Sequence, residues 1–285
     1  MALARLDGRI CLVTGATSGI GQETARGLAG LGAHVVIVGR DRARAESTRK
    51  AIVERSGNPR VDVLLADLSS LAGIRGLADE FLSSYPALHV LVNNAGTVEL
   101  SRTVTVDGFE KTFAVNHLAY FLLTNLLLPR LRASAPARIV NVASEAHRFG
   151  RIDLADLQSE KSYAAMRVYG TSKLLNLLFT VALAERLAGS GVTANCLHPG
   201  AVSTGLGKQN GALAKLLIGL LRPFFLTAEQ GAANSIFVAA SDELAGVSGK
   251  YFVKQRAVAP SRRSQRLELA RRVWARSNEL VGLPG

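Results

Sequence analysis

Residues 9–21, RICLVTGATSGIG, lead from an apolar run through a glycine-rich turn into a helical pattern. The run at 9–15 is typical of a buried strand. The glycines of TGATSGIG (14–21) let the backbone turn tightly, and the free N–H groups at the start of the following helix can face an anion such as a pyrophosphate. A glycine pattern alone is weak evidence, but the flanking strand and helix are the context that a dinucleotide-binding turn requires. The alternative is a helix that merely begins with glycines.

The same order of strand and helix continues along the chain. The predicted strands are apolar along their whole length, as burial on both faces of a sheet requires. This alternation predicts an α/β fold with right-handed crossovers, a doubly wound parallel sheet of about seven strands, and helices on both faces. No repeat or Pro/Ser/Gly linker interrupts the series, so residues 1–285 are predicted to form a single domain. The strands are expected at 9–15, 34–39, 61–67, 89–96, 137–144, 191–200 and 249–253, and the helices at 20–31, 42–56, 70–84, 109–131, 163–188 and 228–241.

The composition and the lengths of the apolar runs indicate where in the cell the protein is expected. Of the 285 residues, 48% are hydrophobic and 20% charged, an ordinary balance for a soluble protein. The first strand begins near Arg9, which leaves no room for a secretory signal, so a cytoplasmic protein is expected. The stretch nearest to a membrane span, 212–226, contains Lys215, Arg222 and Pro223, and it is not expected to cross a membrane.

The formal net charge of +12 is concentrated near the C-terminus. From Lys250 onward, nine lysines and arginines stand against Glu268 and Glu279, a local balance of +7. The basic extension at 255–285 could attract phosphates, anionic lipid or nucleic acid. A solvated helical face is favoured and nucleic-acid binding disfavoured, because apolar residues recur there at helical spacing and would dock the helix onto the body. These residues are Leu267, Ala270, Val273, Trp274 and Leu280.

The residues that end the second predicted strand, VIVGRD, bear on the choice between two cofactors. An NAD site would have an acidic residue about 20 positions beyond the glycines to hold the ribose hydroxyls. This chain instead has Gly39 and Arg40, and Arg40 with Arg42 or Arg44 can hold a 2′-phosphate through charge-assisted hydrogen bonds. The pattern favours NADP(H) over NAD(H). Asp41 would repel that phosphate, so it is expected to point away or to cap the next helix.

Seven motifs occur in the order that is characteristic of the short-chain dehydrogenase/reductase family, and the chain resembles this family along almost its whole length. The resemblance implies a Rossmann fold, a nicotinamide cofactor and a carbonyl or alcohol substrate. SGKYFV, NELVGLPG, Arg40 and SEAH are similar to the retinol dehydrogenase and WW-domain oxidoreductase branch. The seven motifs are TGATSGIG (14–21), ADLSS (66–70), NNAG (93–96), VNHLAYFLLT (115–124), NVASEAH (141–147), YGTSK (169–173) and HPGAVST (198–204).

The YGTSK segment places Tyr169 and Lys173 one helical turn apart. Residues at i and i+4 share a helix face about 6 Å apart, so the Lys173 ammonium is expected near the Tyr169 hydroxyl. A free phenol has a pKa of about 10, and a neighbouring ammonium, joined by the charge of an oxidised nicotinamide, is expected to lower it and make Tyr169 a usable proton shuttle. On this segment alone, an amphipathic helix with a snorkelling lysine is the alternative.

Ser144 and Asn116 complete the catalytic set that the resemblance implies. In the family the active-site serine ends the fifth strand and the tyrosine follows in the spacing seen here, which selects Ser144 and Tyr169. The rival phenol, Tyr163, is expected to line the site or lie at the surface. Ser144 would hydrogen-bond the substrate oxygen, or simply cap the next segment. Asn116 would anchor a water that links Lys173 to solvent, with a capping or core amide as the alternative.

The other motifs resemble the family's contacts to the cofactor. ADLSS resembles the adenine contacts, NNAG the segment that steadies the fourth strand and passes beneath the adenosine, and HPGAVST the loop over the nicotinamide and pyrophosphate. The cofactor-binding residues so implied are Gly15, Thr17, Ser18, Gly19, Ile20, Gly21, Arg40, Asp67, Leu68, Asn94, Ala95, Gly96, Tyr169, Lys173, Pro199, Gly200, Val202 and Thr204.

No metal site is predicted. Three of the five histidines, His117, His147 and His198, lie beside functional motifs, but no pair shows ligand spacing with a carboxylate or thiolate set. The only cysteines, Cys11 and Cys196, fall in predicted strands, where buried reduced thiols are expected.

The sequence therefore predicts an NADP(H)-dependent oxidoreductase. Substrate choice is expected to reside in 145–165 and in a lid at 201–226, whose leucines and phenylalanines suit a lipophilic aldehyde, ketone, retinoid or steroid-like molecule. The same lid could rest on a membrane surface. A sensor or scaffold that binds NADPH without turnover is the alternative, although such proteins usually lose the tyrosine or the lysine. Apolar faces at 109–131 and 163–188 suggest a homodimer.

Overall fold

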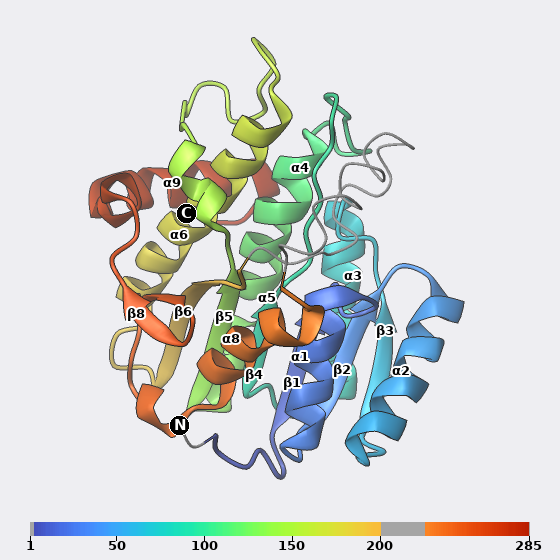
Figure 1. Ribbon diagram of the computed structural model, residues 1–285. Coiled ribbons are helices and arrows are strands. Elements are labelled where there is room, and N and C mark those ends of the chain that lie inside the picture. Colours follow the sequence, from blue (N-terminus) through green and yellow to red (C-terminus); the bar gives the residue numbers. More distant parts are fainter. Residues whose placement is uncertain (1–2, 201–225, 285) are drawn as a thin grey trace.

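The computed structural model describes residues 3–200 and 226–284, and Figure 1 shows a single sheet between two layers of helices. The strand order is β3-β2-β1-β4-β5-β6-β7-β8, and neighbouring strands are parallel except for the β7–β8 pair. The predicted doubly wound α/β fold is confirmed. The strands are β1 (Ile10–Thr14), β2 (His34–Gly39), β3 (Val61–Leu65), β4 (Val90–Asn93), β5 (Ala137–Val142), β6 (Val192–His198), β7 (Tyr251–Val253) and β8 (Arg256–Val258).

The eighth strand was not predicted. It pairs antiparallel to β7 through a turn in which Lys254 and Gln255 adopt left-handed φ values of 49° and 62°. Hairpin turns of this kind usually carry asparagine or glycine, so the Lys-Gln pair gives no sequence signal. The three residues of β8 are exposed and show no apolar alternation. An edge strand of this composition looks like a loop in the sequence.

The helices divide into two layers that bury alternate residues of the same strands. Leu12 of β1 belongs to the core beneath α3, α5, α6 and α9, whereas Cys11 and Val13 belong to the core beneath α1 and α8. Both cysteines, Cys11 and Cys196, are free and buried, as predicted. The helices are α1 (Gly19–Gly30), α2 (Arg42–Ser56), α3 (Leu71–Ser84), α4 (Lys111–Phe113), η1 (Ala114–Leu118), α5 (Ala119–Ala133), η2 (Glu145–Phe149), α6 (Ala165–Arg186), α8 (Ala228–Ala240), η4 (Asp242–Leu244), η5 (Arg262–Gln265) and α9 (Leu267–Val281).

The strand order reverses beside β1. The chain builds β1, β2 and β3 outward in one direction, and then returns to place β4 on the other side of β1. Loops that leave β1 and β4 at their carboxyl ends therefore diverge. Ligands of open α/β sheets bind in the crevice that such a switch point creates.

The C-terminal helix α9 docks onto α6, as the apolar spacing predicts. The indole ring of Trp274 packs 4.9 Å from the ring of Phe121 on α5 and 5.7 Å from that of Phe179 on α6. The sequence predicted a homodimer because the helices now labelled α5 and α6 are apolar on more than one face. Helix α9 of the same chain covers at least part of this apolar surface. Of the residues named for docking, Ala270, Val273 and Trp274 are buried and Leu280 is partly buried, whereas Leu267 is exposed.

One helical segment of the described chain, Lys111–Ala133, is long and apolar enough to cross a membrane by length and composition alone. The predicted nearest candidate, 212–226, falls almost wholly outside the described residues. In Lys111–Ala133, 72% of the most apolar window is buried inside the protein, as in the core helix of a soluble domain. Core burial therefore accounts for its composition.

His117 in η1 joins three helices. Its Nδ1 lies 3.2 Å from Oδ1 of Asn176 on α6, and its Nε2 lies 3.0 Å from Oγ of Ser277 on α9. Burial lowers the pKa of His117 from 6.5 to about 4. Between these values the unfolded chain binds the extra proton, so stability is lost as the pH falls.

We expect the free energy of unfolding to decrease by up to about 3 kcal/mol between pH 6.5 and 4 through His117 alone. Urea denaturation at both pH values would measure it, with His117→Gln as the non-titrating comparison. The His117→Gln variant should lose this part of the pH dependence. A control variant, His34→Gln, changes a histidine at a more exposed site and should still show the loss of stability that His117 causes. An equal pH dependence in the wild type and His117→Gln would contradict the assignment.

Candidate active site

The glycine turn after β1 packs against the segment that follows β4. Gly15 has φ +62°, and a Cβ there would lie 2.7 Å from Cα of Ala95. A Cβ on Gly21 would lie 2.4 Å from both Nδ2 of Asn94 and the carbonyl oxygen of Gly15. Real Cβ atoms do not approach backbone so closely, so glycine is required at both positions. The turn can take this shape only because these side chains are missing.

Helix α1 begins without a side-chain cap. Ser18 stands at the N-cap position in an extended conformation, and its hydroxyl makes no capping hydrogen bond. The first N–H groups of a helix have no partner within the helix, so those of Gly19, Ile20 and Gly21 remain available to an anion. This donor set fits a phosphate group. Thr17 is fixed beside it, because its backbone oxygen accepts a hydrogen bond of 3.2 Å from Nε of Arg44.

The NNAG segment holds the glycine turn in place through hydrogen bonds. Nδ2 of Asn94 donates to the backbone oxygens of Thr14 and Gly15, at 2.8 and 3.2 Å. The hydroxyl of Thr14 in turn accepts from the backbone N–H groups of Asn94 and Ala95. Asn94 therefore fixes the shape of the glycine turn. Gly96 follows, and a Cβ there would lie 3.4 Å from Oδ1 of Asn116 and 3.6 Å from Nζ of Lys173, so this glycine adjoins two of the predicted catalytic residues.

Arg40 is exposed at the end of β2, on the same edge as the glycine turn. Asp41 caps α2 by accepting a 2.7 Å hydrogen bond from the backbone N–H of Arg44, as predicted. Burial raises the pKa of Asp67, but hydrogen bonds from Ser69 and the charge of Arg40 outweigh it and hold that pKa below its ordinary value. Arg40 and Asp67 therefore lie near one another. Leu68, predicted at the adenine, has its side chain buried in the core.

Ser144 meets Tyr169 at the end of β5. The Ser144 hydroxyl accepts a 3.2 Å hydrogen bond from the N–H of Ala146 and so caps η2. The Ser144 side chain also lies close enough to the phenol of Tyr169 to favour a lower pKa of that phenol. The capping interpretation of Ser144 is therefore confirmed, while its hydrogen bond to a substrate oxygen stays a prediction.

Lys173 is buried and close to Tyr169, but it does not make that phenol acidic on its own. Its Nζ donates a 3.0 Å hydrogen bond to the carbonyl oxygen of Val142 and lies 5.7 Å from the centre of the Tyr169 ring. Burial lowers the pKa of Lys173 to about 8. Burial also raises the pKa of Tyr169, and Ser144 only opposes this. In the chain without a cofactor desolvation therefore dominates, and the expected lowering of this pKa by Lys173 together with an oxidised nicotinamide stays a prediction.

Asn116 lies in a single π-helical turn, η1, within the long helical segment. Such turns often occur at functional sites. The amide of Asn116 is buried and fully engaged: Oδ1 accepts from the N–H of Thr97 at 2.7 Å, and Nδ2 donates to Ser172 Oγ at 3.0 Å. Its backbone oxygen accepts from Nδ2 of Asn176 at 2.8 Å. Ser172 and Asn176 were missed by the sequence analysis, although both are polar residues in an apolar helix.

His147 holds the backbone of Ser144 in place. Its Nδ1 donates to the Ser144 carbonyl oxygen at 2.8 Å, and its Nε2 accepts from the N–H of Ser261 at 3.2 Å. The sequence placed His147 beside a functional motif but gave it no role. This contact ties Ser144 to the segment before α9, which is far away in the sequence.

Tyr163, the rival phenol, is unsuited to act as a base. Its hydroxyl donates to the Glu99 carbonyl oxygen at 2.9 Å and lies 3.2 Å from Oε1 of Glu110. Burial, together with the charge of Glu110, raises the pKa of Tyr163 to about 12. The choice of Tyr169 over Tyr163 thus has a physical basis.

The remaining predicted contacts follow β6. Pro199 and Gly200 lie directly after this strand, and Gly200 has φ +96°. Val202, Thr204 and the predicted lid up to residue 225 lie outside the described residues. Within residues 3–200 and 226–284, no group of three histidine, cysteine, aspartate or glutamate side chains could hold a metal ion.

Comparisons with known proteins agree with this geometry. A family profile described as short chain dehydrogenase matches residues 9–213. Retinol dehydrogenase 12 of Mus musculus is 46% identical over 98% of this chain and 88% of its own length, and retinol dehydrogenase 11 of Homo sapiens is 44% identical over the same shares.

Among solved structures, an uncharacterized protein from Mycobacterium Paratuberculosis has a TM-score of 0.80 at 34% identity, covering 99% of this chain and 96% of its own. The RhlG/NADP active-site complex of Pseudomonas aeruginosa has a TM-score of 0.70 at 31% identity, covering 88% of this chain and 97% of its own.

Proposed function

This chain belongs to the short-chain dehydrogenase family of oxidoreductases, and we propose that it interconverts a carbonyl and an alcohol with NADP(H). One observation carries the proposal. The side chain of Ser144 acts on the phenol of Tyr169, and Nζ of the buried Lys173 lies 5.7 Å from the centre of the same ring. Two hydroxyls and an ammonium near the carboxyl end of β5 suit the binding of one oxygen atom and the movement of its proton.

The residues around the turn fit a dinucleotide. The uncapped start of α1, reached through Gly15 and Gly21, would hold the pyrophosphate. Arg40 would hold the 2′-phosphate of NADP(H), and Arg44 would fix the turn through Thr17. When bound, the nicotinamide supplies the hydride, while the protein contributes placement and electrostatics.

Ser144 and Tyr169 would both hydrogen-bond the substrate oxygen. Because burial keeps the phenol protonated, Tyr169 is ready to donate its proton to that oxygen during reduction. The ammonium of Lys173 would stabilise the phenolate that remains. Asn116 and Lys173 meet at Gly96, so they would form the path along which Tyr169 regains a proton.

The substrate is proposed to be lipophilic, of the retinoid, steroid or lipid aldehyde class. The retinol dehydrogenases to which the chain is similar support this choice. Two large apolar side chains that are close in sequence to Ser144 and Tyr169 are also exposed: Phe149, at the end of η2, is 71% exposed, and Met166, in the first turn of α6, is 59% exposed. An apolar substrate would cover such side chains.

The function is tested by incubating the protein with NADPH and a panel of aldehydes, retinal and a short polar aldehyde among them. We expect NADPH to be consumed in step with alcohol formation, measured by absorbance and by mass spectrometry, with retinal preferred. A protein that binds NADPH tightly yet consumes none with any aldehyde would be a sensor or scaffold, and the enzymatic proposal would fail.

The cofactor preference depends on Arg40. We expect Arg40→Ala to weaken NADPH binding by about 10- to 100-fold, because charge-assisted hydrogen bonds to a phosphate contribute about 1.5–3 kcal/mol. NADH binding should change little. Arg49→Ala is the matched control, since Arg49 lies on α2 and pairs with Glu46 at 2.8 Å. Equal weakening of NADPH and NADH binding by Arg40→Ala would show that Arg40 does not read the 2′-phosphate.

A further inference from the structure

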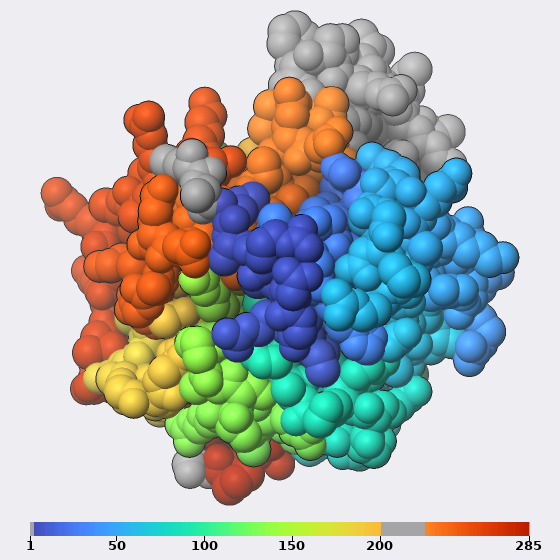
Figure 2. All heavy atoms as spheres, turned by 90° about the horizontal axis from the view of Figure 1, so that it is seen from below, coloured from blue at the N-terminus to red at the C-terminus, as the bar shows by residue number. Residues whose placement is uncertain are grey.

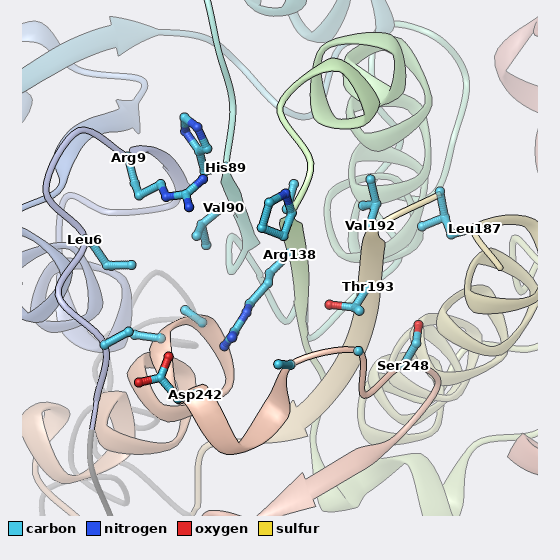
Figure 3. Close-up of a pocket in the computed structure, with 18 of the residues that line it drawn as sticks. Leu6, Arg9, His89, Val90, Arg138, Leu187, Val192, Thr193, Asp242 and Ser248 are labelled. Carbon is cyan, nitrogen blue, oxygen red and sulfur yellow. The ribbon is translucent and has the colours of Figure 1, made fainter. Parts of the chain in front are cut away.

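A cavity of about 510 Å³ opens at the amino-terminal ends of β4, β5 and β6. The catalytic groups follow the carboxyl ends of these strands, so the cavity lies at the opposite edge of the sheet. Figure 2 looks onto this face, and Figure 3 shows the side chains that line the cavity. Its volume is within the usual range of small-molecule sites. The mechanism above does not use it.

The lining of the cavity is positively charged. Its ionisable residues are three arginines, one histidine and a single carboxylate, Asp242. Arg5 is paired with Asp7 at 3.0 Å, but no ion pair joins Arg9 or Arg138 to any residue in the described ranges. Two guanidinium groups on the wall therefore lack a direct counter-ion.

Arg138 is a partly buried cation with little compensation for its charge. Arg138 is the second residue of β5, and its side chain points into the cavity (Figure 3). The only hydrogen bond of its guanidinium group among the described residues is a long one of 3.5 Å to the Val238 carbonyl oxygen. Burial lowers the pKa of Arg138, and the charge of Asp242 only opposes this. A partly buried guanidinium in this state would gain from a carboxylate bound at short range.

Two further donors lie on the same wall. Nδ1 of His89 accepts a 3.0 Å hydrogen bond from the N–H of Ile10, so the neutral ring carries its proton on Nε2. Burial, and then the charge of Arg9, lower the pKa of His89, which keeps the ring neutral. The hydroxyl of Thr193 is buried without a hydrogen-bond partner and points toward Arg138 (Figure 3). Buried hydroxyls are normally satisfied, so this one indicates an absent partner.

The rest of the lining is apolar, which limits the kind of anion that would fit. Phosphate alone would leave this apolar surface uncovered, whereas a carboxylate with a hydrocarbon body would cover it and place its charge at the arginines. We propose that this cavity binds a small amphipathic carboxylate, with its charged group on Arg138 and near Arg9, and a hydrogen bond from Thr193. The apolar lining comprises Leu6, Val90, Leu187, Val192, Pro136 and several alanines.

The test is calorimetric titration of the full chain with octanoate, with octanamide as the neutral probe and inorganic phosphate as the headgroup-only probe. We expect octanoate to bind with 1:1 stoichiometry and the other two at least about tenfold more weakly, because a charged hydrogen bond contributes that much. Arg138→Gln should weaken octanoate by about tenfold or more, and Thr193→Val by about threefold. Arg272→Gln, on the exposed face of α9, should not change it.

NADP+ separates this site from the catalytic one. Octanoate should bind equally well in saturating NADP+, and Arg138→Gln should bind NADP+ like the wild type, which also shows that the variant is folded. The proposal is overturned if octanoate does not bind, if NADP+ displaces it, or if both Arg138→Gln and Thr193→Val bind it unchanged. Phosphate binding as tight as that of octanoate would also overturn it. None of these results bears on the proposed oxidoreductase activity.

Discussion

Tyr169→Phe is expected to lower kcat for NADPH-dependent aldehyde reduction by about 10²- to 10⁴-fold, the range that positioned proton donors contribute. The phenol lies close to Ser144, and Nζ of Lys173 lies 5.7 Å from the centre of its ring. The substitution removes one oxygen and keeps the ring. NADPH affinity and the melting temperature should therefore change little, and stopped-flow single turnovers would assign the loss to the chemical step.

Tyr163→Phe is the matched control for this substitution. Tyr163 is also a partly buried phenol near the site, but its hydroxyl is engaged by the Glu99 carbonyl oxygen and by Glu110. Its removal should cost about 1 kcal/mol of stability and leave kcat nearly unchanged. If the two variants lost equal activity, or if Tyr169→Phe kept the wild-type rate, the role of Tyr169 as proton donor would be wrong.

Gly21→Ala is expected to weaken NADPH binding by on the order of 100-fold, or about 2.7 kcal/mol. The added Cβ would lie 2.4 Å from the Gly15 carbonyl oxygen, and backbone on both sides of the contact cannot yield as a flexible side chain would. The start of α1 must then move away from the turn, which spoils the phosphate cradle. Calorimetric titration with NADPH measures the loss, and thermal denaturation should show a lower midpoint.

Gly30→Ala tests whether this loss is specific. Gly30 ends the same helix, and a Cβ there would meet nothing within 4 Å. Alanine is a better helix former than glycine by up to about 1 kcal/mol, so Gly30→Ala should be neutral or slightly stabilising and bind NADPH normally. Unchanged NADPH affinity in Gly21→Ala would mean that the turn does not form the cofactor site.

The parallel sheet was predictable because its signals are local. Each of the strands β1 to β7 is a short, mostly apolar run, and longer helical segments alternate with the first six of them. The cap formed by Asp41 was predictable for the same reason, since the partner N–H belongs to Arg44, only three residues on. Strand β8 was not, because its two-residue turn at Lys254 and Gln255 contains none of the residues that favour left-handed φ.

The parts of the site that the sequence did not reveal depend on distant segments. His147 holds Ser144 and is itself held by Ser261, a contact over 114 positions in the chain. The pKa of Tyr169 depends on how deeply the fold buries the phenol, and the spacing of Tyr169 and Lys173 could not show that burial is the largest cause of its shift. Sequence patterns predict which side chains lie close together, whereas the pKa values of these side chains depend on the packing around them.

The most direct test of the central claim is the pKa of Tyr169 with and without NADP+. The ultraviolet absorbance of tyrosinate, followed through an alkaline titration in the wild type and in Tyr169→Phe, isolates this phenol by difference. The account predicts a pKa above that of a free phenol in the chain alone and a lower pKa once NADP+ adds its positive charge beside Lys173. An unchanged pKa in a protein saturated with NADP+ would contradict the assignment of Tyr169 as the proton-transferring residue.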